Sequence, residues 1–293
     1  MTANPLSLGN LRLAVLIDAE NVPRNCIKKV MEEIAIYGTP TIKRIYGDWT
    51  SSVVSGWKAS LLENAITPIQ QYSYTSGKNS SDSAMIIDAM DILYTDKTDG
   101  FVLVSSDSDF TRLAIRLREA GQRVIGIGER KTPSAFIAAC DKFTYIEVIL
   151  EKFAEGVKSD LKEVDDSSNF TETGLHNEIE WSTDVDTSQN EPQPQSLHRN
   201  KSHHSHGSEN GKIPDAVIKN IASSVADLAG EDGYAFLGEL GNLILKKQPD
   251  FDNRNYGFKS LSAMIKSMDR FEIDFRQTTD PNIKHVWVKD KES

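Results

Sequence analysis

The sequence predicts an α/β fold, with a parallel sheet sandwiched by helices, followed by a small winged-helix domain. Three observations predict this. Short apolar runs alternate with amphipathic stretches from Arg12 to Glu147, polar residues dominate the next segment, and helical spacing returns near Ile213. Alternation of this kind favours a parallel sheet covered by helices. The expected parts are a first domain at 10–153, a disordered acidic linker at 154–211 and a second domain at 212–290.

Six extended runs are candidate strands in the first domain. They are Leu13–Ile17, Thr41–Tyr46, Pro68–Tyr72, Phe101–Ser105, Val124–Ile127 and Phe143–Ile146. Amphipathic stretches between them predict five helices. These are Arg24–Ile36, Ser51–Glu63, Ser81–Tyr94, Phe110–Ala120 and Pro133–Cys140. Gly121 follows the fourth helix, where a glycine C-terminal cap is expected.

The second domain begins with apolar residues at helical spacing from Ile213 to Leu228, and a second helix is expected around Phe236, Leu240 and Ile244. The stretch Tyr256–Ser267 predicts a third helix. Two short strands follow, Phe271–Arg276 and His285–Val288. Helices followed by a two-stranded hairpin make a small winged-helix module.

Charge is unevenly distributed along the 293 residues. The net charge is −10, but residues 1–150 contribute −1, residues 151–211 contribute −8 and residues 212–293 contribute −1. The acidity belongs to the expected linker, so whole-chain charge does not exclude nucleic-acid binding by the flanking domains. Cys26 and Cys140 are expected to be buried, reduced thiols. No targeting segment or membrane-length apolar run is visible, which favours a cytoplasmic protein that does not contact membranes.

Aspartates follow two of the predicted strands. Asp18 ends the first apolar run, and Asp107 and Asp109 follow the run Phe101–Ser105. The carboxyl ends of parallel strands meet at the sheet edge where ligands bind in α/β proteins. Carboxylates that converge there repel one another unless a cation lies between them, and oxygen-rich sites suit Mg²⁺ or Mn²⁺. The pattern predicts a metal site for phosphate chemistry.

Helical geometry adds Asp82 to this set. At 100° per residue, Asp82 lies on the same face as Ile86, Ala89 and Leu93, whereas Asp88 points away. A carboxylate directed at the core is costly unless it is paired or metal-bound. Asp88 is expected to assist from a distance or to lie on the surface. Simpler interpretations stay open: Asp82 as a first-turn acid favoured by the helix dipole, and Asp109 as a helix N-cap.

The motifs Ile17-Asp-Ala-Glu-Asn21, Lys78-Asn-Ser-Ser-Asp82 and Val104-Ser-Ser-Asp-Ser-Asp-Phe110 resemble the NYN domain, a branch of the PIN-like nucleases. The resemblance covers about residues 10–150. It implies a PIN-like α/β sandwich whose acidic cluster binds Mg²⁺ or Mn²⁺ and hydrolyses RNA. Carried onto this chain, it assigns Asp18, Asp82, Asp107 and Asp109 to metal binding and catalysis, with Asn21 and Ser106 assisting. Asn21 could instead hold the turn before Pro23.

The remaining residues of the first domain favour metal-assisted hydrolysis. The first 150 residues contain no His, which argues against a His-ligated zinc hydrolase and against a pair of catalytic histidines. No Ser/His/Asp set is evident either. One or two hard cations would polarise the phosphate and activate water. Lys78, Arg130 and Lys131 are candidate phosphate contacts, although each could equally be a solvated surface residue.

The stretch Asp250–Ile265, and Asn255-Tyr-Gly-Phe-Lys-Ser-Leu within it, resembles the OST-HTH (LOTUS) domain over residues 212–290. The resemblance implies a winged helix that binds RNA, including G-rich forms, or a protein partner. Four cations could contact phosphates: Arg254, Lys259, Lys266 and Lys284. Tyr256 or Phe258 could stack on a base, but core packing is expected for at least one of them.

The sequence thus predicts a metal-dependent ribonuclease, in which a flexible linker lets the tethered module raise the RNA concentration at the acidic cluster. The main alternative is a regulatory RNA-binding adaptor that cleaves little. A hydrolase acting on DNA or on phosphomonoesters is a third. Sequence preference, the number of metals and the oligomeric state stay open.

Overall fold

The computed structural model describes residues 11–72, 80–152, 213–277 and 284–293. The first domain is built on a six-stranded sheet of order β3-β2-β1-β4-β5-β6, in which every neighbouring pair is parallel. The strands are β1 (Arg12–Asp18), β2 (Thr39–Gly47), β3 (Thr67–Gln70), β4 (Gly100–Val104), β5 (Arg123–Gly128) and β6 (Lys142–Tyr145). All six predicted strands are present, with ends that shift by a few residues.

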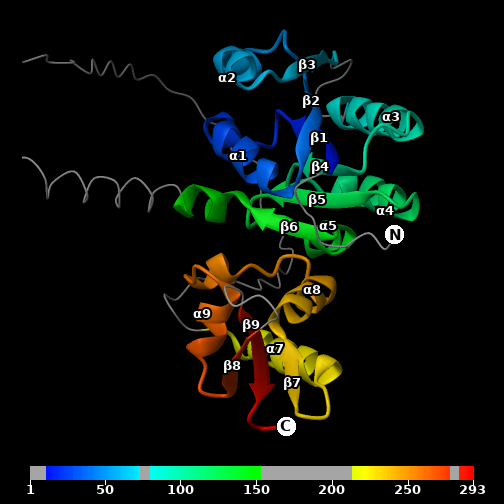
Figure 1. The fold of residues 1–293 in the computed structure, drawn as a ribbon. Coiled ribbons are helices and arrows are strands. Elements are labelled where there is room, and N and C mark those ends of the chain that lie inside the picture. Colours follow the sequence, from blue (N-terminus) through cyan, green and yellow to red (C-terminus); the bar gives the residue numbers. More distant parts are fainter. Residues whose placement is uncertain (1–10, 73–79, 153–212, 278–283) are drawn as a thin grey trace, which may run out of the picture.

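Helices cover both faces of this sheet (Figure 1). The α-helices are α1 (Ile27–Tyr37), α2 (Lys58–Asn64), α3 (Ser80–Tyr94), α4 (Thr111–Glu119), α5 (Ser134–Ala139) and the helical residues 146–152. Short 3-10 turns precede three of them: η2 (Arg24–Cys26), η3 (Ser52–Trp57) and η4 (Ser108–Phe110). Gly121 ends α4 with a φ of +81° and donates its backbone N–H to Arg118 O, which confirms the predicted glycine cap.

Alternate residues of β1 supply the two halves of the core. Leu13, Val15 and Ile17 pack with apolar residues of α1, α2 and the helical residues 146–152, whereas Ala14 and Leu16 pack with α3, α4 and α5. Successive side chains of a strand point to opposite faces, so a strand buried on both faces has a continuous apolar run. This explains why Leu13–Ile17 carries no polar residue.

The order of the strands reverses between β1 and β4. From β1 the chain adds β2 and β3 on one side of the sheet, and then α3 returns it to β4 on the other side. Such a switch point leaves a crevice at the carboxyl ends of the two central strands, where α/β proteins bind ligands. The residues that follow β1 and β4 therefore meet there.

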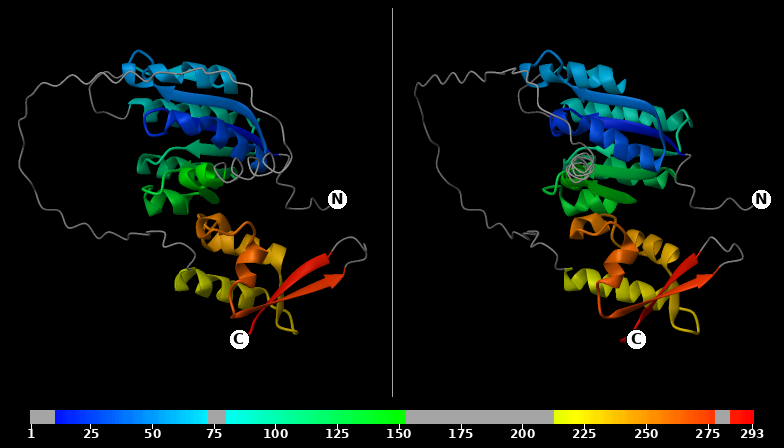
Figure 2. Two further views of the ribbon diagram at one scale, coloured as in Figure 1. Left: turned by 90° about the vertical axis from the view of Figure 1, so that its left-hand side faces the viewer. Right: turned by 60° about the vertical axis from the view of Figure 1, so that its left-hand side comes forward.

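The second domain packs three helices against a three-stranded antiparallel sheet of order β7-β9-β8. Its elements are α7 (Asp215–Leu228), β7 (Tyr234–Phe236), α8 (Leu237–Lys247), the 3-10 turn η5 (Asn253–Tyr256), α9 (Leu261–Lys266), β8 (Phe271–Gln277) and β9 (Lys284–Asp290). It lies beside β6, the last strand of the large sheet, as Figures 1 and 2 show.

Two predictions for the second domain were wrong. The sheet has three strands rather than two, because Tyr234–Phe236 pairs with β9 as β7 instead of beginning a helix. The expected third helix is also interrupted. Gly257 adopts a φ of +79°, which ends η5, and α9 starts only after Ser260, whose hydroxyl accepts a hydrogen bond from Ala263 N.

Several expectations concern residues outside the described ranges: the linker at 154–211 and Lys78. The two cysteines are free and buried, as expected. Burial raises the pKa of Cys26 to about 11, so its thiol stays protonated at neutral pH. Among the described residues, no helix is both long and apolar enough to span a membrane.

Candidate metal centre

Three aspartates converge at the switch point of the sheet. Asp82, Asp107 and Asp109 each offer a carboxylate oxygen, and these three oxygens all lie within 4.8 Å of one another. Asp82 is buried, Asp107 is half-buried and Asp109 is exposed, so the group opens from the protein interior to solvent. Three carboxylate oxygens that converge in this way suit a hard divalent cation.

The loop after β4 places Asp107 and Asp109. Asp107 is the N-cap of η4, and its Oδ1 accepts a hydrogen bond from Asp109 N at 2.9 Å. The alternative interpretation of this loop named Asp109 as the helix cap, and the cap is Asp107 instead. In a turn of this kind the Asp side chain holds the backbone two residues further on, and the carboxylate oxygens of Asp107 and Asp109 lie within 4.8 Å of each other. Phe110 is fully buried directly after them and anchors the turn in the core.

Asp82 enters the group from the first turn of α3. Its side chain is only 7% exposed, in agreement with its predicted place on the apolar face of the helix. Burial, followed by repulsion from Asp18, Asp107, Glu20 and Asp109, raises the pKa of Asp82 to about 7. In the absence of a cation, several negative charges are therefore held together against their mutual repulsion.

Asp18 lies next to this group but is held by other partners. It is 2% exposed. Its Oδ1 accepts hydrogen bonds from Glu20 N and Asn21 N, and its Oδ2 accepts from Asn21 Nδ2 and from Ser105 Oγ, both at 2.8 Å. Asp18 is not among the three acids with converging oxygens. Its charge acts on Asp82 through space, while Asn21 holds the carboxylate and the turn together.

Ser105 connects the two strand ends, and sequence reasoning missed it. This fully buried residue donates its hydroxyl to Asp18 Oδ2, and its Oγ accepts a hydrogen bond from Asp107 N at 3.1 Å. Ser106, which the sequence favoured, instead accepts a hydrogen bond from Glu129 N at 2.8 Å and so holds the loop after β5. A signal for Ser105 existed, because a Ser at the last position of a buried strand needs a polar partner.

Glu20 and Asp88 complete the acidic surroundings in different ways. Glu20 is exposed, its Oε1 lies 3.4 Å from Ser81 Oγ, and it contributes to the raised pKa of Asp82. Asp88 lies a turn and a half further along α3 and binds Arg44 and Tyr46 of β2. Asp88 therefore fastens α3 to the sheet, whereas Glu20 adds negative charge near the cluster, a contribution that sequence reasoning missed.

Replacing Ser105 with Ala is expected to weaken metal binding by about 10–100-fold, because residues that orient metal ligands have effects of this size. The change removes the link between Asp18 and the Asp107 backbone. A Mn²⁺ titration followed by calorimetry measures the affinity. Ser106→Ala is the matched control, since Ser106 touches Glu129 rather than the acids. Equal losses of affinity in the two variants would contradict the role given to Ser105.

Two family models match the chain, one for the NYN domain at residues 12–147 and one for the OST-HTH/LOTUS domain at residues 212–283. The chain joins an NYN domain to an OST-HTH/LOTUS domain. The motifs at Asp18, Asp82 and Asp107 lie within the NYN match. NYN domains belong to a superfamily that consists mainly of ribonucleases, and OST-HTH/LOTUS domains are associated with RNA binding.

Three solved structures show similarity to parts of the chain. A protein of unknown function from Vibrio parahaemolyticus is 20% identical over 47% of this chain and 93% of that one, with a TM-score of 0.40. An uncharacterized protein from Nitrosomonas europaea is 29% identical over 36% and 92%, with a TM-score of 0.25. A protein from Chromobacterium violaceum is 26% identical over 28% and 85%, with a TM-score of 0.23. No curated protein matches the chain.

The candidate RNA contacts lie in different environments. Five cations are exposed: Arg130 and Lys131 of the NYN domain, and Lys259, Lys266 and Lys284 of the OST-HTH/LOTUS domain. Of these, Lys131 pairs with Glu129. Arg254 is engaged by Asp252 and by Glu33 of the NYN domain. Tyr256 and Phe258 both pack against the core of the OST-HTH/LOTUS domain, as expected for at least one of them.

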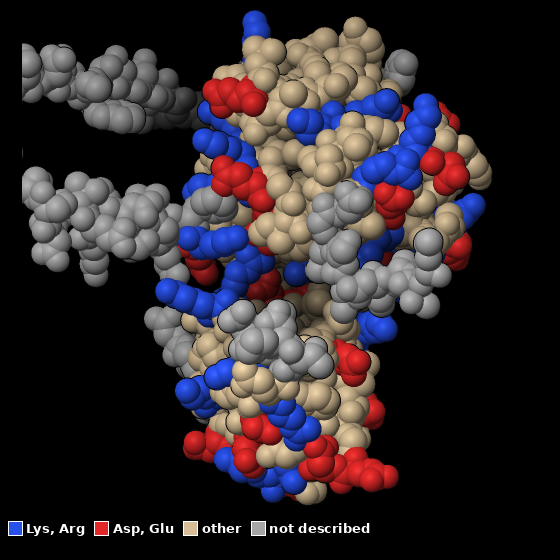
Figure 3. All heavy atoms as spheres, in the orientation of Figure 1, with Lys and Arg blue, Asp and Glu red and all other residues tan. Residues whose placement is uncertain are grey.

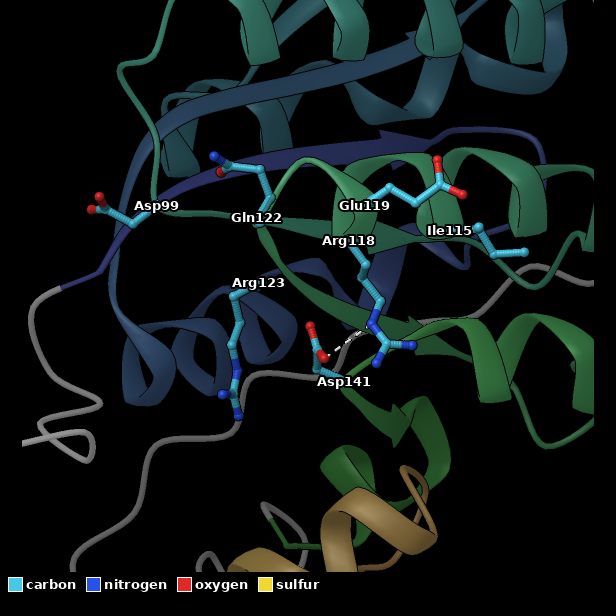
Figure 4. A pocket seen from close by; sticks show the side chains of 8 residues that line it. Asp99, Ile115, Arg118, Glu119, Gln122, Arg123 and Asp141 are labelled. Atoms are coloured by element: carbon cyan, nitrogen blue, oxygen red, sulfur yellow. Dashed lines mark ion pairs between the residues drawn. The ribbon is translucent and has the colours of Figure 1, made fainter.

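A shallow pocket of the NYN domain lies away from the acids. It is lined by Asp99, Arg118, Arg123 and Asp141, and Figure 4 shows the ion pair between Arg118 and Asp141, which spans 3.0 Å. Asp99, Arg123 and Asp141 stand at or just before the starts of β4, β5 and β6, so the pocket is at the amino edge of the sheet. The acidic cluster occupies the opposite, carboxyl edge.

Proposed function

We propose that the chain is a ribonuclease that depends on Mg²⁺ or Mn²⁺, with the acidic cluster as its active site. The convergence of the Asp82, Asp107 and Asp109 oxygens within 4.8 Å carries this proposal. These three residues would hold the cation. When bound, it would polarise the scissile phosphate and lower the pKa of a coordinated water.

Residues next to the three converging acids would prepare the site for this chemistry. Asp18, held by Ser105 and Asn21, keeps a fixed negative charge beside Asp82. The turn capped by Asp107 keeps Asp109 at the solvent side, where a phosphodiester can approach. Such preorganised charges need no rearrangement when the substrate binds.

The OST-HTH/LOTUS domain would supply RNA affinity. Its exposed Lys259, Lys266 and Lys284 would contact phosphates, together with Arg130 and Lys131 of the NYN domain. We propose that the RNAs bound by the OST-HTH/LOTUS domain include G-rich sequences. Comparing the binding of a G-rich and a U-rich oligonucleotide of equal length, at several salt concentrations, separates base preference from phosphate affinity.

Wild-type protein is expected to cut a labelled single-stranded RNA when Mn²⁺ or Mg²⁺ is present and to stop in EDTA. The double variant Asp107→Asn/Asp109→Asn should lose roughly 10³-fold in rate, because it removes two of the three converging charges. Asp91→Asn is the matched control, since Asp91 is an exposed acid of α3. Matched DNA and nucleotide monophosphate substrates test the other hydrolase classes.

One observation favours the adaptor alternative. Asp18 is committed to internal hydrogen bonds, which leaves three converging acids instead of the four expected. If neither wild type nor the double variant cuts RNA, yet both bind it equally, the nuclease proposal is wrong and the chain acts as an RNA-binding adaptor.

A further inference from the structure

The two domains are joined by a built polar interface. Arg254 of η5 donates from Nη1 to Glu33 Oε2 at 3.0 Å and from Nη2 to Glu33 Oε1 at 2.7 Å. Glu33 belongs to α1 of the NYN domain and is 2% exposed. The forked geometry of this pair is the strong form of a carboxylate–guanidinium contact.

Further groups satisfy the same two charges. Tyr37 donates its hydroxyl to Glu33 Oε1 at 2.7 Å, and Lys152 lies 3.5 Å from Glu33 Oε2. On the other side, Asp252 accepts hydrogen bonds from Arg254 Nε and Nη2. Buried charges are costly unless every one is paired. Here every charge is paired, and the forked contact between Glu33 and Arg254 is the part of the network that exists only while the two domains are in contact.

Two contacts on β6 continue the interface. The backbone N–H of Phe143 donates to Pro249 O at 2.8 Å, so the outer edge of the large sheet bonds to the OST-HTH/LOTUS domain. Tyr145, at the carboxyl end of β6, donates its hydroxyl to Asp250 Oδ2 at 2.8 Å. The contacts therefore run along β6 and reach the same sheet edge as the acidic cluster.

Arg130 stands at this border. It follows β5, and its guanidinium carbon lies 5.5 Å from the centre of the Tyr145 ring. The cluster follows β4, two strands from β6. Neighbouring strands are about 4.8 Å apart, so the carboxyl ends of β4 and β6 are separated by about 10 Å. An RNA strand covers this distance with about three stacked nucleotides. Figure 3 shows side chains of both charges along the junction of the domains.

We propose that the OST-HTH/LOTUS domain is docked on β6 rather than freely tethered, and that Glu33 and Arg254 are positioning residues that fix the path of RNA from this domain, past Arg130, to the acidic cluster. This inference rests on the proposed function for the RNA path. The docking itself rests on the contacts alone. Arg254, expected from the sequence to bind phosphate, holds the domains together instead.

The test compares full-length wild type with Arg254→Gln, which keeps a polar side chain but removes the fork. Small-angle X-ray scattering should show compact wild type and a larger maximum dimension for the variant. Arg270→Gln is the matched control, because Arg270 pairs with Asp290 inside the OST-HTH/LOTUS domain. Tyr145→Phe is a milder second variant that removes only the hydrogen bond to Asp250.

Cleavage supplies the second measurement. Arg254→Gln should raise KM for a 20-nucleotide RNA by about tenfold, while kcat stays unchanged. The rate on a dinucleotide, which is too short to span the distance between the two domains, should also stay unchanged. Unchanged scattering in both interface variants, or an extended wild type, would overturn the docking. If Arg254→Gln separates the domains but the wild type never cuts RNA, the docking proposal is supported and the nuclease proposal is refuted.

Discussion

Replacing Asp82 with Asn is expected to stabilise the metal-free protein at pH 8 and to abolish metal-dependent RNA cleavage. Asp82 is buried among acids, and its pKa is raised to about 7. The unfolded chain has an ordinary Asp pKa near 4. Between these values the folded state binds more protons than the unfolded state, so stability falls as pH rises. Well above pH 7, Asp82 is ionised in both states, and the folded state bears the full cost of the buried charge.

Three pKa units correspond to about 4 kcal/mol, which is an upper limit for the gain from Asn. Thermal unfolding in EDTA measures it: the variant should exceed wild type by several degrees at pH 8 and match it near pH 4. Adding Mn²⁺ should raise the melting temperature of wild type and of the Asp91→Asn control, but not of Asp82→Asn. A lower melting temperature for Asp82→Asn at pH 8 in EDTA would contradict this account of the cluster.

Acidification should remove the stability that Glu33 provides. Burial alone would raise the pKa of Glu33, but hydrogen bonds from Arg254 and Tyr37 and the charges of Arg254 and Lys152 lower it to about 2. A lowered pKa stabilises the folded state above the ordinary Glu value of about 4.3, and this contribution is lost as pH falls toward 2. The difference of more than two units corresponds to about 3 kcal/mol.

Urea unfolding of wild type and Glu33→Gln checks this second expectation. The gap between their midpoints should be large at pH 7 and should shrink steadily from pH 4.5 to pH 2. Asp99→Asn is an instructive control. The pKa of Asp99 is also lowered to about 2 by Arg12, but its side chain is 37% exposed. Solvent screens such pairs, so Asp99→Asn should cost less than about 1 kcal/mol. If Glu33→Gln and Asp99→Asn lowered the free energy of unfolding equally at pH 7, the importance given to burial would be contradicted.

Local patterns predicted most of the fold, because the central strands β1, β4 and β5 are almost wholly buried and therefore carry apolar runs that the sequence shows directly. The 3.6-residue period likewise placed Asp82 on the buried face of α3. In contrast, β7 has only three residues and pairs with β9, some fifty residues away, so no local period marks it. The split at Gly257 depends on a single positive φ.

The site was harder to predict because hydrogen bonds select among equivalent residues. Ser105 and Ser106 are identical neighbours, and only the strand end decides which one meets Asp18. Arg254 carried the same charge as the lysines expected to bind RNA. Its partner Glu33 lies 221 positions earlier in the chain, and a single sequence contains no sign of that contact.

The hydrogen bond from Phe143 N to Pro249 O covers the edge strand of the large sheet, which would be open if the second domain were removed. Open sheet edges are templates for unwanted pairing between molecules. The OST-HTH/LOTUS domain shields the β6 edge. The carbonyl of Pro249 accepts a hydrogen bond there, but Pro249 has no N–H and therefore cannot continue the sheet by donating one. A fragment that ended at residue 152 would bare this edge and strip Glu33 of its guanidinium partner. We therefore expect the second domain to protect the first from self-association.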